Sequence, residues 1–152
     1  MEEWVPSLAE YFAAQPDVVA AYVFGSVAQG RARAGSDVDI AVLLAADLDG
    51  EARFERRLRL GWEVESIIGR PTDLVVLNDA PPLLQHQVLK HGRLIFERDR
   101  AARVEFEVRA GKIYADLKPM YDFHARDLLQ KIKEVGLVGR RRRHRQPVED
   151  PR

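Results

Sequence analysis

The chain has 152 residues, of which 46% are hydrophobic and 32% are charged, and its 24 basic residues balance 24 acidic residues. This composition predicts one soluble domain with a buried core, because no apolar run approaches the ~20 residues that span a bilayer. Cysteine is absent and the N-terminus is acidic where a signal peptide would be basic. We therefore expect a cytoplasmic protein without disulfides, thiolate metal sites or a membrane anchor.

The charges are distributed unevenly along the chain. Arg140 is followed by RRRHR at residues 141–145, and the rest of the chain carries 19 basic against 24 acidic residues. Because phosphate binding needs a basic surface, the body is expected to bind nucleic acid poorly, and only the Arg140 to Arg145 segment qualifies as a contact. We predict a domain over residues 1–139 and a disordered basic tail over residues 140–152.

The hydrophobic pattern predicts alternating strands and helices, followed by one long helix. The strands are expected at residues 18–24, 37–44, 72–77 and 93–97, and the helices at residues 8–15, 27–29, 50–68, 83–91 and 99–135. Pro119 should kink the last helix, because a proline inside a helix removes one hydrogen bond. The predicted fold class is α/β (α+β), with a mixed sheet, flanking helices and a long C-terminal helix.

Two carboxylates stand at the start of the second predicted strand. Asp37 and Asp39 are two residues apart, so their side chains should share one face while Val38 and Ile40 point into the core. Two ionised carboxylates in a partly buried site repel each other unless a cation lies between them. Mg²⁺ fits, because it prefers oxygen ligands and is commonly held by carboxylates together with substrate phosphates.

A Gly-Ser pair after the first predicted strand supplies a place for those phosphates. Gly25 lacks the Cβ that would block close approach, and Ser26 can donate a hydroxyl where a helix begins. On their own these two residues would more commonly form a turn and a helix cap. Together with Asp37 and Asp39 they predict a triphosphate lying between the helix start and the metal.

A third carboxylate would complete a site for two metal ions. Asp73 is the first candidate, because it lies early in an apolar strand on the face of Val75 and Leu77, where an unpaired charge is costly. Two Mg²⁺ ions could then stabilise the attacking and leaving oxygens of an in-line displacement. Asp73 could also accept the proton of the nucleophile, and Asp79 is the next candidate along the chain.

The motif resembles that of the DNA polymerase β-like nucleotidyltransferases, and more narrowly that of the minimal nucleotidyltransferase (MNT) family. The pattern GSxxxGxxxxxSDxD is intact from Gly25 to Asp39 and includes Ser36, which the resemblance adds to Gly25 and Ser26 as a nucleotide-binding residue. The segment YADLKPMYDFHARDLL resembles the C-terminal helix of MNT proteins that pair with HEPN-domain toxins.

This resemblance implies an antitoxin that transfers AMP from ATP, with Mg²⁺, to a tyrosine of a partner HEPN RNase toxin, in a hetero-oligomer. Asp37, Asp39 and Asp73 would be its catalytic and metal-binding residues. Two alternatives remain open: a small-molecule enzyme of the aminoglycoside-modifying type, and an antitoxin that neutralises its toxin by binding alone. We favour a protein acceptor, because the aminoglycoside-type enzymes normally carry a further helical domain for their substrate.

Overall fold

The structure is a computed structural model that describes residues 2–33 and 35–145. Its centre is a four-stranded mixed sheet in the order β3-β2-β1-β4, formed by β1 (Val18–Phe24), β2 (Val38–Leu44), β3 (Thr72–Val76) and β4 (Arg93–Glu97). Strand β1 pairs antiparallel with β2 and with β4, whereas β2 and β3 run parallel. The predicted α/β class with a mixed sheet is confirmed.

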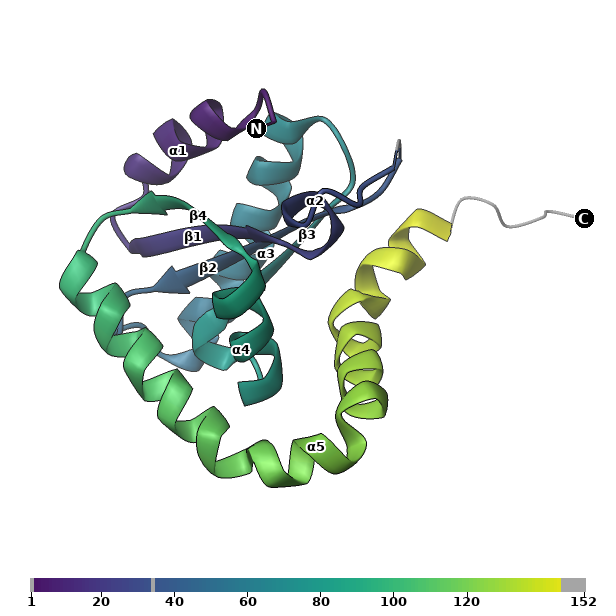
Figure 1. Cartoon of the computed structure of the whole chain (residues 1–152). Coiled ribbons are helices and arrows are strands. Elements are labelled where there is room, and N and C mark those ends of the chain that lie inside the picture. The colour runs from purple at the N-terminus through teal and green to yellow at the C-terminus, as the bar shows by residue number, and fades with distance from the viewer. Residues whose placement is uncertain (1, 34, 146–152) are drawn as a thin grey trace, which may run out of the picture.

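Helices cover both faces of this sheet (Figure 1). They are α1 (Val5–Ala13), the short α2 (Gly25–Ala28), α3 (Gly50–Ile68), α4 (Pro82–His91) and α5 (Arg100–Arg145), with a 3-10 turn, η1, at Leu77–Asp79. One core cluster joins the sheet to α1 and α3 through Leu8, Phe12, Leu60 and Val64. The other joins the opposite face to α4 and α5 through Leu84, Val88, Phe106 and Ala110.

The long helix α5 bends and returns on the other side of α4 (Figure 1). Its backbone leaves the helical region at His124, with φ −125° and ψ 19°, and not at Pro119, where we expected the kink. Proline has a helix-compatible φ near −65°, so Pro119 costs the helix a hydrogen bond without interrupting it. The first part of α5 is fixed to the sheet by Tyr22, whose hydroxyl donates to Glu107 Oε2 at 2.8 Å.

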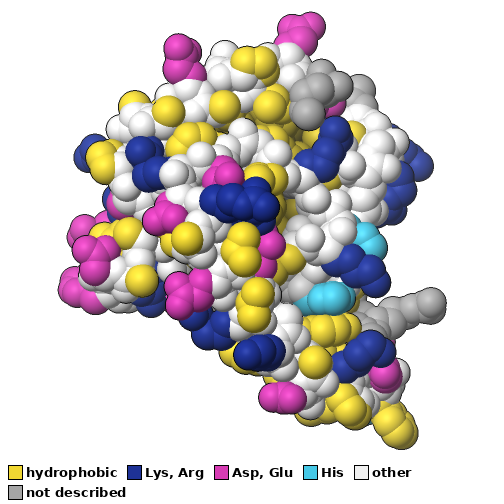
Figure 2. Space-filling view, turned by 60° about the vertical axis from the view of Figure 1, so that its left-hand side comes forward, with side chains coloured by type: hydrophobic (Ala, Val, Ile, Leu, Met, Phe, Trp, Pro, Cys, Tyr) yellow, Lys and Arg dark blue, Asp and Glu magenta, His cyan; other side chains and the backbone are white. Residues whose placement is uncertain are grey.

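The basic segment begins inside α5, which continues to Arg145, so the helix does not end at the expected domain boundary after Gly139. Residues 146–152 of the expected tail lie outside the described residues, and disorder of the tail stays a prediction. Within the described residues, every helix is too short or too polar to cross a bilayer. On the described part of the face in Figure 2, acidic, basic and apolar side chains are interspersed and form no continuous basic patch.

Candidate active site

The sheet register places two of the predicted aspartates side by side. Asp39 on β2 is the register partner of Asp73 on β3, so the two residues occupy neighbouring strands at the same level. Each lies on the face that α4 and α5 cover, since Ala41 follows Asp39 and Leu77 follows Asp73 at even spacing, and both belong to that core cluster. Neighbouring strands are about 4.8 Å apart, which brings the two carboxylates within reach of a shared cation.

Gly25, which follows β1, packs against the carboxylate of Asp39. Phe24, the last residue of β1, pairs with Asp39, and Gly25 follows at the start of α2 with φ +74°. A Cβ built on Gly25 would lie 2.1 Å from Asp39 Oδ2 and 3.1 Å from its Cγ, so only glycine leaves room for this carboxylate. Ser26 follows, half-buried, in the first turn of α2.

Asp37 lies at the same end of the sheet as Asp39, but it precedes Val38, the first residue of β2. The loop before it is held by Ser36, whose backbone N–H donates to the carbonyl oxygen of Arg33 and whose hydroxyl accepts from the N–H of Arg33, both at 2.9 Å. On the other side, Arg70 Nη2 donates to the carbonyl oxygen of Ser36 at 2.8 Å. Ser36 therefore shapes the loop that carries Asp37, a role that the motif alone does not indicate.

The three aspartates differ in their burial. Asp73 is 7% exposed, whereas Asp37 and Asp39 are half-buried, as expected for a site that opens to solvent on one side. Among residues 2–33 and 35–145, no three His, Asp or Glu side chains are grouped so that they could hold a metal ion by themselves. The donor set still suits Mg²⁺, which usually takes one or two carboxylates and completes its six oxygen ligands with water and substrate phosphates.

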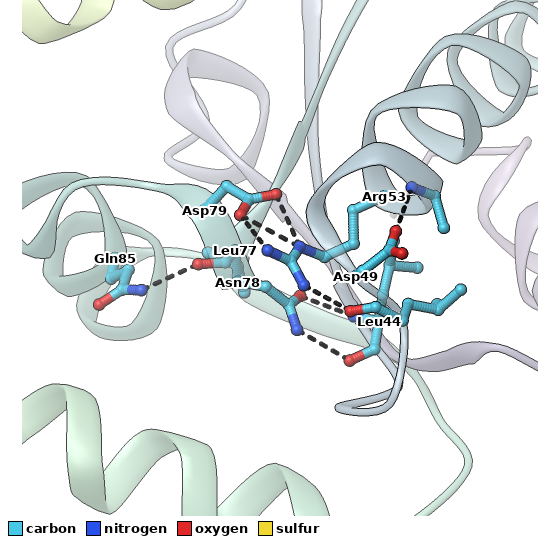
Figure 3. A network of polar contacts seen from close by, with 9 residues as sticks. Leu44, Asp49, Arg53, Leu77, Asn78, Asp79 and Gln85 are labelled. Atoms are coloured by element: carbon cyan, nitrogen blue, oxygen red, sulfur yellow. Dashed lines mark hydrogen bonds and ion pairs between the residues drawn. The ribbon is translucent and has the colours of Figure 1, made fainter.

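Asp79, the other candidate for the third carboxylate, lies in η1 beyond the end of β3, whereas Asp73 lies near the beginning of that strand. Figure 3 shows Asp79 beside Arg53. Asp79 forms an ion pair with Arg53, with Nη2 of Arg53 2.8 Å from Oδ1 of Asp79. Its neighbour Asn78 is hydrogen-bonded to the backbone N–H and C=O of Leu44, the last residue of β2, both at 2.9 Å. A cavity of about 650 Å³ beside this network is lined by Arg53 and Asp79 and not by the motif aspartates. Asp79 is therefore paired with Arg53 and is not placed to share a metal ion with Asp39.

Comparisons with known proteins show the family to which this chain belongs. Residues 7–101 match the family described as polymerase beta, nucleotidyltransferase. The chain is 34% identical over 103 residues to the protein adenylyltransferase MntA of Shewanella oneidensis, an alignment that covers 68% of this chain and 70% of that protein.

Solved structures give the same result. A toxin-antitoxin structure with AMP-PNP has a chain with a TM-score of 0.64 and 28% identity, covering 84% of this chain and 99% of that one. A chain from the complex of a tri-AMPylated S. oneidensis HEPN toxin with MNT antitoxin has a TM-score of 0.54 and 27% identity, covering 81% and 98%. The chain therefore belongs to the polymerase β nucleotidyltransferase family, in the branch of minimal nucleotidyltransferases that includes MntA.

Proposed function

We propose that this protein is a Mg²⁺-dependent protein adenylyltransferase that acts as an antitoxin by transferring AMP from ATP to a tyrosine of a partner HEPN RNase. The observation that carries the proposal is the convergence of Gly25, Asp39 and Asp73 from three strands. This convergence occurs in a chain that is 34% identical to a protein adenylyltransferase. The proposal includes a complex with the partner, because the acceptor tyrosine must reach the end of the sheet where these residues lie.

The reaction is a single in-line displacement at phosphorus. The tyrosine hydroxyl oxygen of the partner forms a bond to the α-phosphorus of ATP, and the bond from that phosphorus to the oxygen bridging to the β-phosphate breaks. Pyrophosphate leaves with the electron pair of that bond. The phenolic proton goes to a carboxylate, for which Asp73 is the candidate, because it is buried beside Asp39 in the register of the sheet, where the reacting oxygens would lie.

The remaining residues bind and orient the nucleotide. Gly25 and Ser26 open α2, where backbone N–H groups without helical partners can bind phosphate oxygens. Asp37, Asp39 and Asp73 would hold Mg²⁺, which when bound stabilises charge on the transferring phosphate and orients both reacting oxygens. The proposal includes two Mg²⁺ ions, which these three carboxylates would hold together. Ser36 would support the nucleotide from the loop before Asp37.

The proposal is tested with the purified protein, its HEPN partner, ATP and Mg²⁺. Intact-mass spectrometry of the partner should show the addition of one or more AMP groups, and peptide mapping should place them on tyrosine. An RNase assay run in parallel should show loss of cleavage as modification proceeds, because the added phosphate is an anion that competes with RNA for cationic side chains. Omitting Mg²⁺ should stop both changes.

The assay also separates the two alternatives. An unmodified partner together with ready adenylylation of an aminoglycoside would replace this proposal with the small-molecule enzyme. Inhibition of the RNase by stoichiometric binding, with an unchanged partner mass and no need for ATP, would support an antitoxin that acts by binding alone.

A further inference from the structure

Asp37 is held differently from the other two aspartates. Asp39 and Asp73 lie within β2 and β3, where the ladder of the sheet fixes their positions relative to each other. Asp37 precedes β2, and the register of β2 with β3 begins only at Val38, paired with Thr72. The sheet ladder therefore does not place its backbone, and the contacts of the residues on either side of it contribute to that placement.

Two hydrogen bonds fix the backbone on both sides of Asp37. The carbonyl oxygen of Ser36 accepts from Arg70 Nη2 at 2.8 Å, and the backbone N–H of Val38 donates to the carbonyl oxygen of Pro71 at 3.0 Å. Their partners are consecutive residues in the turn between α3 and β3. This turn therefore contacts the chain immediately before and immediately after Asp37.

The turn is itself well anchored. Gly69 ends α3 with φ +79° and donates its N–H to the carbonyl oxygen of Glu65 at 2.8 Å. Thr72, 3% exposed, donates its N–H to Glu65 Oε1 at 3.1 Å and its hydroxyl to the carbonyl oxygen of Arg70 at 2.9 Å. These bonds fix the backbone of Arg70, so its guanidinium can hold the loop before Asp37 at a constant distance from the turn.

The guanidinium of Arg70 is partly withdrawn from solvent. Its Nε is buried and has no hydrogen-bond partner within the described part of the chain, although a buried donor without a partner is unfavourable. A surface arginine turned outward would avoid this cost. We interpret this cost as the consequence of placing Nη2 against the carbonyl oxygen of Ser36.

We propose that Arg70 is a positioning residue for nucleotidyl transfer, which fixes the peptide before Asp37 so that this carboxylate faces the same metal and phosphates as Asp39 and Asp73. In this role Arg70 acts through the backbone of Ser36 and not by binding the nucleotide or the metal. The inference rests on the proposed function for its rate measurements, but it also predicts properties of the free protein and of nucleotide binding.

The test compares Arg70→Met, which keeps the length of the side chain without its donors, with Arg70→Lys, which keeps one cationic donor. Arg59→Met is the matched control, because Arg59 is an exposed arginine on α3, the helix that precedes the turn of Arg70. Hydrogen exchange of the free protein should be faster in residues 36–38 of Arg70→Met and unchanged in Arg59→Met. Calorimetry with Mg²⁺ and a non-hydrolysable ATP analogue should show weaker binding for Arg70→Met, with partial recovery for Arg70→Lys.

In the transfer assay we expect Arg70→Met to lower kcat by about ten- to a hundredfold, since misplacing one catalytic group by about 1 Å has an effect of that order. The Mg²⁺ concentration that gives half-maximal rate should rise, and the KM for the partner should stay unchanged. Arg70→Lys should restore part of kcat, whereas Arg59→Met should match the original protein.

Two results would overturn the inference. The first is an Arg70→Met variant with unchanged exchange at residues 36–38 and unchanged Mg²⁺–nucleotide binding. The second is a loss of rate that equals the loss of folded protein measured by circular dichroism and is not recovered by Arg70→Lys. If the original protein transfers no AMP while Arg70→Met still weakens Mg²⁺–nucleotide binding and loosens residues 36–38, the proposed function fails and the role of Arg70 stands.

Discussion

Replacing Gly25 with alanine should separate the stability of this protein from its chemistry. The added Cβ would lie 2.1 Å from Asp39 Oδ2, a distance that non-bonded atoms do not occupy, so one of the two residues must move. The carboxylate is the end of a side chain and can rotate away, whereas the backbone of Gly25 is fixed between β1 and α2. Asp39 should therefore lose its position beside Asp73 while the fold persists.

The size of each effect follows from the same geometry. Alanine at φ +74° is strained by about 1–2 kcal/mol, which lowers the melting temperature of a domain of this size by about 2–8 °C. Displacement of a catalytic carboxylate by about 1 Å should slow transfer by about a hundredfold. Melting is followed by calorimetry, and transfer by the rate of mass increase of the partner with saturating ATP and Mg²⁺.

Gly69→Ala is the matched control for this experiment. Gly69 has φ +79°, and a Cβ built there meets no atom within 4 Å, so the variant has the same backbone strain without the clash. We expect a similar fall in melting temperature and a transfer rate within about threefold of the original, since an alanine that keeps the φ of Gly69 meets no atom and leaves the turn with Arg70 in place. Full activity of Gly25→Ala, or an equal loss of activity in both variants, would refute the close contact between Gly25 and Asp39 as the basis of the site.

Three other variants provide independent tests. Asp37→Asn with Asp39→Asn should abolish transfer and leave the melting temperature unchanged or higher, because carboxylate repulsion is relieved; full transfer by a folded double variant would contradict the metal site. Asp73→Asn should slow single-turnover transfer by about 10²–10⁴-fold while the affinity for an ATP analogue, measured by calorimetry, changes less; an unchanged rate would exclude Asp73 as the base. Burial and nearby cationic side chains lower the pKa of His86 in the folded protein. As the pH drops below about 6.5, the unfolded chain therefore binds a proton at His86 before the folded chain does, and the free energy of unfolding should fall. His86→Phe keeps the ring that stacks on Tyr114 and should reduce this loss in chemical denaturation at pH 7.5 and 5.5; an unchanged pH dependence would assign the effect to another group.

Local sequence patterns were sufficient for most elements and for the faces of Asp39 and Asp73, whereas Asp37, predicted as the first residue of the second strand, precedes β2. The apolar residues of α3 and the glycine after it predict the observed bounds Gly50–Ile68, and RLIFE forms β4 as predicted. Helix α1 starts at Val5, three residues before the predicted start, with a proline in its first turn. Such starts are difficult to predict because proline is favourable in the first turn of a helix and unfavourable further inside it.

Contacts between distant segments were not predictable from these patterns. Arg70 lies in a turn, where an arginine is normally solvated, and its partner Ser36 is 34 residues away. The bend of α5 was expected at Pro119 because proline is the local signal, but the break lies at His124, where the surrounding residues give no such signal. The contact of Arg70 with Ser36 depends on how the turn meets the loop before β2, which a short stretch of sequence does not show.

The mixed sheet explains how three motifs far apart in the sequence form one site. Gly25 follows the end of β1, whereas Asp39 and Asp73 lie near the beginnings of β2 and β3. Antiparallel pairing brings the end of β1 to the beginning of β2, as the partners Phe24 and Asp39 show, and parallel pairing keeps the beginnings of β2 and β3 together. If β1 ran parallel to β2, Gly25 would be at the opposite end, and if β3 ran antiparallel, Asp73 would be there instead. The two kinds of pairing are therefore both required for a phosphate-binding turn and paired carboxylates to meet.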